Sequence, residues 1–312
     1  MNKNLKIAVL CGGDSAEAEV SRVSARGVAD ALLTNYRNVT IIELSRHLAS
    51  HLAEFAPDVV FPVLHGPPGE DGTLQGFLEI CGYAYVGSDV ASSAAAMDKI
   101  TAKLLFASCN LPLAEQVIVT RRDDVAAAVD KIARDFGHYV VVKPSRQGSA
   151  LGVTLVDNEN QLHAAVETAL KLDDRILVER RIEGREITVG VIDTDEGTMA
   201  LPVIEIITPE NAWYDYAHRY TVGFSDHIMP ADLPATQTQR LQQIAIDAHQ
   251  GLGCRDLSRA DFVVAGEQEE YLLEVNTMPG MTPTSLYPDG ARGFGLDFPA
   301  LVSHLVERAA RR

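Results

Sequence analysis

Short apolar runs alternate with amphipathic segments along the first third of the chain. Four apolar runs predict buried strands, at 6–11, 39–44, 58–64 and 85–87. Helical spacing follows at 14–33, at 73–81 and from about Ser88, and Asp14 and Glu17 stand at the spacing of a capping box. Alternating strands and helices are typical of a parallel, doubly wound sheet covered on both faces, so we expect an N-terminal α/β domain over residues 1–96.

The pattern changes after about Ala96. Helices are predicted at 99–108, 123–136 and 161–171, and strands at 117–119, 139–144, 153–156 and 175–180. These elements predict a small α+β unit with an antiparallel sheet over residues 97–186. Strands then dominate a third part, 187–312, at 187–192, 201–207, 260–264 and 270–274, with helices at 234–252 and 298–309. No linker is long enough to separate autonomous modules, so we expect the three parts to share one cleft.

Composition narrows the class of protein. Apolar residues make up 46% of the 312 residues and charged residues 22%, which is ordinary for a soluble globular protein. No apolar run approaches the roughly 20 residues of a membrane-spanning helix, and the first apolar run is too short for a signal-peptide core. We therefore expect a cytoplasmic protein. The four cysteines show no paired spacing, so the sequence indicates neither a zinc site nor a disulfide framework.

The charge balance excludes some partners. A net charge of −16 argues against nucleic acid and against an anionic membrane surface, because both require a basic footprint. It does not exclude a nucleotide, since a small anion needs only a local cluster of cations and backbone N–H groups.

Three oxygen-bearing side chains near the C-terminal end form the strongest chemical signal. Asp261 lies in one predicted strand, and Glu274 and Asn276 lie two residues apart at the end of the next. On adjacent antiparallel strands all three side chains can face the same side. Carboxylate and amide oxygens suit Mg²⁺ that also binds phosphates. The alternative is a solvated polar face, but the apolar flanks favour the metal because an isolated buried carboxylate is costly.

Basic residues and glycines earlier in the chain are compatible with phosphate binding. Lys143 ends an apolar strand, Lys99 is the second candidate cation, and Gly148 and Gly152 follow in a loop. The sequence matches neither a Walker A motif nor G-x-G-x-x-G after the first strand, and an ordinary hairpin explains the glycine loop equally well. Acids at the end of the strand 175–180 could bind a sugar or an adenine amino group, or could belong to a solvated turn.

Taken together, these segments resemble the ATP-grasp fold, and more closely the D-alanine–D-alanine ligases. The resemblance runs in order through residues 12–21, 65–72, 97–99, 143–149, 214–216, 259–261 and 274–281. The metal strands indicate only ATP-grasp, whereas Glu17 and the loop at His65 point to the ligase family. The resemblance implies an ATP-grasp fold behind an N-terminal doubly wound domain.

The resemblance also implies a reaction. ATP phosphorylates a first D-alanine to D-alanyl phosphate, and the amine of a second D-alanine displaces phosphate to give the D-Ala-D-Ala dipeptide for peptidoglycan and the cell wall. The implied cofactors are ATP and two Mg²⁺ or Mn²⁺ ions, and the implied assembly is a homodimer. Related reactions with D-serine or D-lactate as second substrate, and an inactive nucleotide-binding ATP-grasp protein, are the alternatives.

The family pattern assigns roles to the matching residues. Asp261, Glu274 and Asn276 would hold the metals, and Arg259 with the N–H of Gly280 would stabilise the tetrahedral oxyanion. Glu17 would take the ammonium of the first D-alanine beside His65, and Ser285 with the N–H of Leu286 would hold the second carboxylate. The nucleotide contacts would come from Lys99, Lys143, Glu179, Arg180, Ile182, Glu186 and Arg219.

A covering loop completes the implied site. Ser149 and Tyr220 would join Glu17 in a hydrogen-bond set that fastens the loop and keeps an acyl phosphate from water. Several residues have simpler explanations: Glu17 as a helix cap, His65 as a loop histidine that bonds backbone, and Tyr220 as a packed aromatic. The family often has lysine where this chain has Arg180 and Arg219. Charge is kept but shape is not, which affects the nucleotide contacts and not the reaction class.

Overall fold

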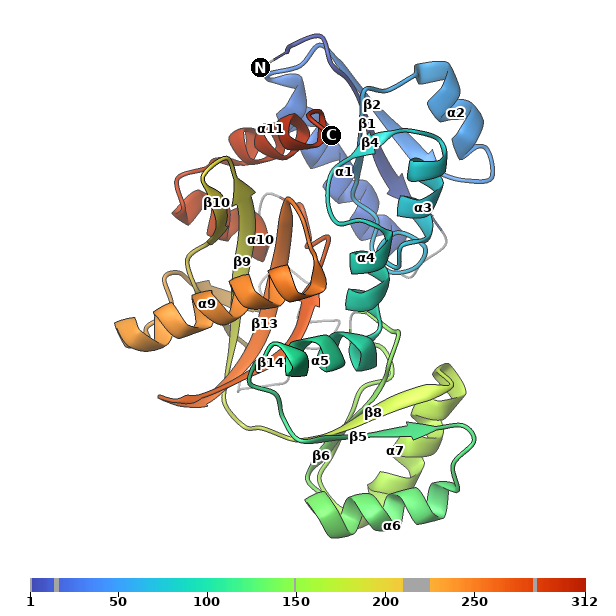
Figure 1. The fold of residues 1–312 in the computed structure, drawn as a ribbon, viewed down its shortest axis with the longest axis vertical. Coiled ribbons are helices and arrows are strands. Elements are labelled where there is room, and N and C mark those ends of the chain that lie inside the picture. Colours follow the sequence, from blue (N-terminus) through green and yellow to red (C-terminus); the bar gives the residue numbers. More distant parts are fainter. Residues whose placement is uncertain (1, 14–16, 149, 210–224, 283–284) are drawn as a thin grey trace.

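Three β-sheets follow one another along the long axis of the molecule. The structure is a computed structural model that describes residues 2–13, 17–148, 150–209, 225–282 and 285–312. In Figure 1 a parallel sheet lies at the top, a six-stranded sheet in the middle and a four-stranded sheet at the bottom. Ser149, Arg219 and Tyr220 lie outside the described residues.

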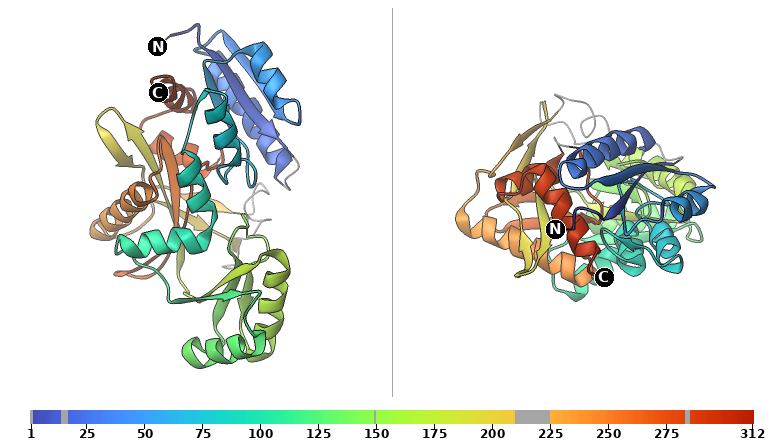
Figure 2. Two further views of the ribbon diagram at one scale, coloured as in Figure 1. Left: turned by 45° about the vertical axis from the view of Figure 1, so that its right-hand side comes forward. Right: turned by 90° about the horizontal axis from the view of Figure 1, so that it is seen from above.

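The N-terminal sheet is parallel and covered on both faces. Its order is β2(Asn38–Leu44), β1(Lys6–Gly12), β3(Val59–Pro62), β4(Ala84–Tyr85). Ile7 and Val9 share one core cluster with residues of α1(Ala18–Leu33) and α11(Phe298–Ala309), whereas Ala8 and Leu10 share another with α2(Leu48–Phe55) and α3(Thr73–Ile80). Successive side chains of β1 therefore point to opposite faces of the sheet and pack into two different cores. The doubly wound prediction is confirmed, with one cover supplied by the far end of the chain (Figures 1 and 2).

The four-stranded sheet belongs to a separate small core. Helices α4(Val90–Met97) and α5(Lys99–Ser108) lead into it. Its antiparallel order is β5(Gln116–Thr120), β8(Arg175–Arg180), β6(Val140–Pro144), β7(Thr154–Val156). Helices α6(Val125–Phe136) and α7(Glu159–Leu172) pack on it around Val140, Val142 and Val178. The predicted α+β unit is confirmed.

The six-stranded sheet carries the C-terminal part. Its path is β12(Asp226–Ile228), β11(Ile204–Ile207), β9(Arg185–Thr194), β13(Leu257–Gly266), β14(Glu269–Asn276), and β10(Gly197–Ala200) pairs with β9. Residues of α5 and α9(Ala235–Leu252) share a core with one face of this sheet. The predicted boundary near residue 96 falls within α4 and the one near residue 186 falls at the start of β9, and the division itself stays a prediction.

Some elements differ from the predictions. The first helix begins at Ala18, so Glu17 occupies the N-cap position instead of the third helical position, and its side chain makes no capping hydrogen bond. The predicted capping by Glu17 is therefore wrong, and Asp14 lies outside the described residues. The strand predicted at 201–207 begins only at Ile204, because Pro202 has no N–H for the ladder. The elements α2, β10, β12 and α10(Leu286–Gly293) were not predicted.

The sequence predicted neither a disulfide framework nor a membrane-spanning helix, and both points can be examined in the part of the chain that the structure describes. The four cysteines are all free, and no helix there combines the length and apolarity needed to span a bilayer.

Candidate active site

Three neighbouring strands present polar side chains on one face of the six-stranded sheet. In β9, Ile187 and Val189 enter the core, so Thr188 between them points to the opposite side. Thr188 pairs with Asp261 of β13, and Asp261 pairs in turn with Glu274 of β14. Arg259 of β13 and Asn276 of β14 form the next pair on the same face of the sheet. The predicted grouping of the three oxygen ligands on one face is present in the structure.

A β-bulge makes this face possible. The register of β13 and β14 shifts between Asp261 and Phe262, because Phe262 pairs with Leu272 and Leu273 is left over. Strict alternation would place Leu272 on the same side as Glu274. Instead Leu272 is fully buried in the core, while Glu274 and Asn276 remain on the polar face. Bulges re-aim side chains in this way next to functional sites.

Asp261 is the centre of a hydrogen-bonded group. Arg259 donates to it through Nε at 2.8 Å and through Nη2 at 2.7 Å, which is the strong two-point geometry of an arginine–carboxylate pair. Thr188 Oγ1 donates at 2.7 Å and Asn276 Nδ2 at 3.0 Å. The carboxylate is thus held in one orientation by three neighbouring strands.

Lys99 links two sheets. Its Nζ lies 3.1 Å from Oε2 of Glu274 and donates to the carbonyl of Gln147 at 2.9 Å. It is the first residue of α5, whose N-cap Asp98 accepts from the N–H groups of Ile100 and Thr101. The lysine therefore joins β14 to the loop after β6, where the sequence predicted phosphate contacts.

The donor set fits a hard divalent cation. Asp261 and Glu274 offer carboxylate oxygens and Asn276 an amide group, which suits Mg²⁺ with phosphate oxygens and water as further ligands. Within the described ranges no group of three or more His, Cys, Asp or Glu side chains forms a metal site.

A buried ion-pair group lies beside these strands. Glu179 at the end of β8 is 3% exposed, and its two oxygens pair with two lysines, Oε2 with the predicted Lys143 and Oε1 with Lys103. Burial alone would raise the pKa of Glu179, but the two lysines lower it to about 2. Sequence reasoning missed Lys103. The available signal was a lysine one helical turn after Lys99, among the buried residues Ile100, Ala102 and Phe106.

The opening segment and the His65 loop meet at Glu17. This carboxyl group is 8% exposed, and a Cβ added at Gly66 would lie 3.4 Å from its Oε2, or 3.9 Å if added at Gly148. His65 is also buried: burial lowers its pKa, Glu17 opposes that effect and Arg259 adds to it. Glu17 and Arg259 therefore both lie close enough to His65 to affect its pKa.

Glu70 is a second residue that the sequence reasoning did not single out. It accepts a hydrogen bond of 2.6 Å from the N–H of Gly66. Burial nevertheless raises its pKa to about 8, and the negative charges of Glu17 and Glu274 act in the same direction. A buried carboxyl group with a raised pKa thus lies close enough to Glu17 and Glu274 to be affected by their charges.

The predicted second-substrate residues lie together at the start of α10. Ser285 is the N-cap and the buried Leu286 the first helical residue, so its N–H points out of the helix toward a possible anion. A Cβ at Gly280 would lie 3.0 Å from Ser285 Oγ, so the backbone of Gly280 runs directly past the serine. The hydroxyl group of Ser285 also lies 2.7 Å from that of Thr282.

The remaining described residues that are predicted to contact the nucleotide are Arg180, Ile182 and Glu186. The side chain of Arg180 is 48% exposed and pairs with Glu115 at 2.5 Å. Ile182 follows β8 and is partly exposed, and Glu186 lies in β9 opposite Val263. For Ser149, Arg219 and Tyr220 the predicted roles stay predictions.

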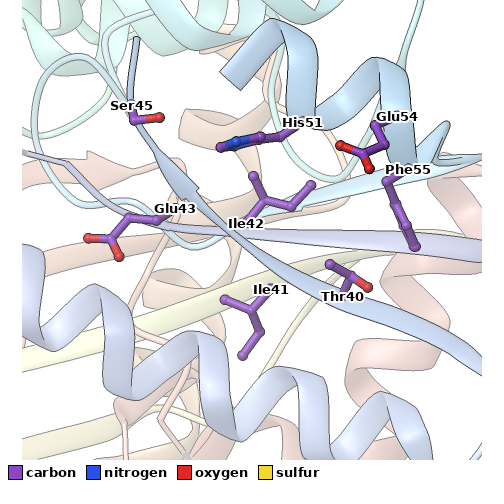
Figure 3. Close-up of a pocket in the computed structure, with 8 residues that line it drawn as sticks. All are labelled: Thr40, Ile41, Ile42, Glu43, Ser45, His51, Glu54 and Phe55. Carbon is purple, nitrogen blue, oxygen red and sulfur yellow. The ribbon is translucent and has the colours of Figure 1, made fainter. Parts of the chain in front are cut away.

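A pocket of about 580 Å³ lies away from all these residues. Figure 3 shows it between the outer strand β2 and helix α2, with Glu43, His51 and Phe55 in its lining. None of the predicted site residues lines it, so it is not the candidate active site.

Comparison with known proteins identifies the family of this chain. Family models described as "D-ala D-ala ligase N-terminus" and "D-ala D-ala ligase C-terminus" match residues 47–88 and 105–307. A D-alanine–D-alanine ligase of Halalkalibacterium halodurans is 42% identical over 99% of this chain and 100% of its own. The Bacillus anthracis ligase complexed with ATP has a TM-score of 0.84 at 28% identity, covering 98% of each chain. The VanG D-Ala:D-Ser ligase of Enterococcus faecalis reaches 0.83 at 32%, covering 98% of this chain and 99% of its own. The chain belongs to the D-alanine–D-alanine ligase family, and is a ligase with the ATP-grasp fold.

Proposed function

We propose that the chain joins two D-alanines into D-Ala-D-Ala with ATP and Mg²⁺, through D-alanyl phosphate. One observation supports this most strongly: Arg259, Asp261 and Glu274 share one polar face, where Lys99 of α5 pairs with Glu274 and Glu17 lies nearby. This face combines a place for metal and phosphate with a carboxylate that can bind an amino acid's ammonium group.

The nucleotide would lie between the four-stranded and six-stranded sheets. Lys99 and Lys143 come from α5 and β6, and their ammonium groups can exchange carboxylate partners for phosphate oxygens. Glu179 and Glu186 would then meet the adenosine. The related Bacillus anthracis structure, which is complexed with ATP, supports ATP as the nucleotide.

Asp261, Glu274 and Asn276 would hold the metal. When bound, two Mg²⁺ ions would neutralise charge on the phosphates, which is the main requirement of phosphoryl transfer. The protein's part is positioning: Thr188 and Arg259 orient Asp261, and Lys99 holds the phosphate loop close to Glu274. Manganese has similar ligand preferences and is an alternative metal.

The amino acids would be held by separate groups. Glu17 would bind the ammonium of the first D-alanine. The carboxylate oxygen of that D-alanine attacks the γ-phosphorus, the bond to the β-phosphate oxygen breaks and ADP leaves, which gives the acyl phosphate. Ser285 and the N–H of Leu286 would bind the carboxylate of the second D-alanine, so that the neutral amine of this D-alanine faces the acyl carbon. Arg259 and the N–H of Gly280 stabilise the oxyanion that develops as the C–N bond forms. Phosphate then leaves with the electrons of the C–O bond.

A first experiment tests the reaction. Phosphate release from ATP and Mg²⁺ is measured with D-alanine, with L-alanine and with no amino acid, and the product is identified by mass. We expect release only with D-alanine and a product with the mass of the dipeptide. Equal release without any amino acid would contradict the ligase proposal. Adding D-serine beside D-alanine tests the alternative suggested by the D-Ala:D-Ser relative, since a dominant mixed dipeptide would reassign the second substrate.

A second experiment tests the metal assignment. Glu274→Gln removes one charge from the proposed metal ligands and should abolish turnover while the protein stays folded. Glu269→Gln, at the exposed start of the same strand, is the matched control and should remain active. Full activity of Glu274→Gln at limiting Mg²⁺ would refute the assignment.

Two broader expectations accompany the reaction. We propose that the protein works in the cytoplasm, which supplies its ATP, and that it forms a homodimer. Sedimentation of the purified protein would test the dimer.

A further inference from the structure

Lys103 occupies an unusual position for a lysine. It lies in α5 and is 1% exposed, among the largest fully buried side chains of the described residues. Its Nζ pairs with Oε1 of Glu179 and donates a weak hydrogen bond of 3.4 Å to the carbonyl of Leu272. Burial lowers the pKa of Lys103, whereas Glu179 raises it. Because a buried ammonium group is costly, its placement requires a strong partner, and Glu179 is that partner.

The two lysines on Glu179 differ in their surroundings. The side chain of Lys143 is 10% exposed and that of Lys103 is 1% exposed. Lys143 belongs to β6, next to the loop that approaches Lys99. Lys103 is enclosed between α5, β8 and β14, because it contacts Glu179 on one side and Leu272 on the other. Only Lys143 is therefore able to move to a phosphate.

This difference has a consequence for nucleotide binding. If Lys143 moves to a phosphate, Oε2 of Glu179 loses its cation, and a buried carboxylate without a cation would take up a proton. Lys103 remains on Oε1 and keeps the group ionised and oriented. Oε2 is then a free, charged acceptor in an apolar setting, which suits an exocyclic amino group and disfavours a carbonyl oxygen at the same place.

We propose that Lys103 is a positioning residue for adenine recognition: it holds Glu179 so that the oxygen released by Lys143 accepts from the 6-amino group of the base. This inference rests on the proposed nucleotide site. Through Leu272 the same lysine also ties the base-binding glutamate to β14, the strand that carries Glu274. Lys103 thus selects ATP over GTP without touching the nucleotide.

The test compares adenine and guanine nucleotides in binding and in turnover. Lys103→Met removes the charge and keeps the chain length, and Lys131→Met, an exposed lysine of α6 that pairs with Asp135, is the matched control. Binding of ATP and GTP in the presence of Mg²⁺ is measured by calorimetry, and steady-state kinetics give KM and kcat. We expect the ATP-over-GTP preference of Lys103→Met to fall at least tenfold, with KM for ATP raised more than kcat is lowered. Lys131→Met should match the wild type.

A double variant separates this role from simple packing. In a Glu179→Gln background, Lys103→Met should change the ATP-over-GTP preference no further, because its effect passes through Glu179. An unchanged preference in folded Lys103→Met, or an equal loss in both backgrounds, would overturn the proposal. If Lys103→Met does not fold, Lys103→Gln replaces it, since the amide keeps a donor without the charge. Calorimetry does not depend on catalysis, so a wild-type protein that selects ATP but makes no dipeptide would contradict the ligase proposal alone.

Discussion

Removing Arg259 tests the candidate site most directly, because this side chain has two separable roles. In the structure it neutralises Asp261 through two hydrogen bonds of 2.8 and 2.7 Å. In the proposed reaction it stabilises the oxyanion. Arg259→Met keeps most of the side-chain volume and removes both interactions. Arg259→Lys keeps the charge but loses the two-point geometry, so it should fall between Met and wild type.

The structure sets the expected sizes of the two effects. Breaking a fully buried ion pair costs about 3–5 kcal/mol, because one charge is left without its partner. Here the side chains of Arg259 and Asp261 are 12% and 15% exposed, and Asp261 keeps its bonds to Thr188 and Asn276. We therefore expect a smaller loss in the free energy of unfolding, about 2 kcal/mol. Loss of one oxyanion donor should lower kcat by roughly 10²–10³-fold.

Two assays distinguish these roles. Urea unfolding gives the stability, and dipeptide formation at saturating substrates gives kcat. The matched control is Arg240→Met, because Arg240 pairs with Glu270 at 2.7 Å in the same part of the molecule but away from the polar face. The control should lose some stability and keep its kcat. A kcat of Arg259→Met within tenfold of wild type would refute the oxyanion role.

Two further predictions concern stability. Asp256 is fully buried and accepts from Arg312 at 2.7 Å through both oxygens, so Arg312→Ala should lower the free energy of unfolding by about 2 kcal/mol in urea, with no change in KM for D-alanine. An unchanged midpoint would show that Arg308, 3.5 Å from the same carboxylate, is sufficient. The pKa of Glu70 is raised from 4.5 to about 8. Between these pH values the unfolded state binds fewer protons than the folded state, so stability should fall as pH rises through this window. Glu70→Gln should flatten that part of the stability–pH curve, and an unaltered slope would assign it to other groups.

Much of the fold follows from local patterns in the sequence. The helices at Lys99–Ser108 and Phe298–Ala309 and the strand at Arg175–Arg180 begin and end where periodicity places them. The short helix Leu48–Phe55 was not predicted, because two buried leucines over eight residues give too weak a period. Helix α10 begins in a segment with Pro288 and two glycines, residues that ordinarily argue against a helix. Its formation depends on packing of the buried Leu286 and Tyr287.

The candidate site was predictable where its chemistry is carried by residue type and spacing. Asp261, Glu274 and Asn276 share a face as two-residue spacing suggests. The bulge at Leu273 was not predictable, because alternation alone cannot show which of two neighbouring leucines enters the core. Lys103 was missed for a different reason. Lys103 lies in helix α5 and its partner Glu179 in strand β8, and no local sequence pattern reveals an ion pair between these two elements.

The charged side chains of the candidate site are paired with one another. Asp261 holds Arg259, Glu274 holds Lys99, and Glu179 holds two lysines. In a protein of net charge −16 this arrangement collects cations where a nucleotide needs them. Under the proposed function, binding is then an exchange, in which metal replaces the lysine on Glu274 and phosphate replaces the carboxylates on Lys99 and Lys143. Metal alone would displace Lys99 from Glu274, and nucleotide alone would draw Lys99 away from Glu274. Since each ligand corrects the charge that the other disturbs, metal and ATP should bind cooperatively, each raising the affinity for the other by the same factor.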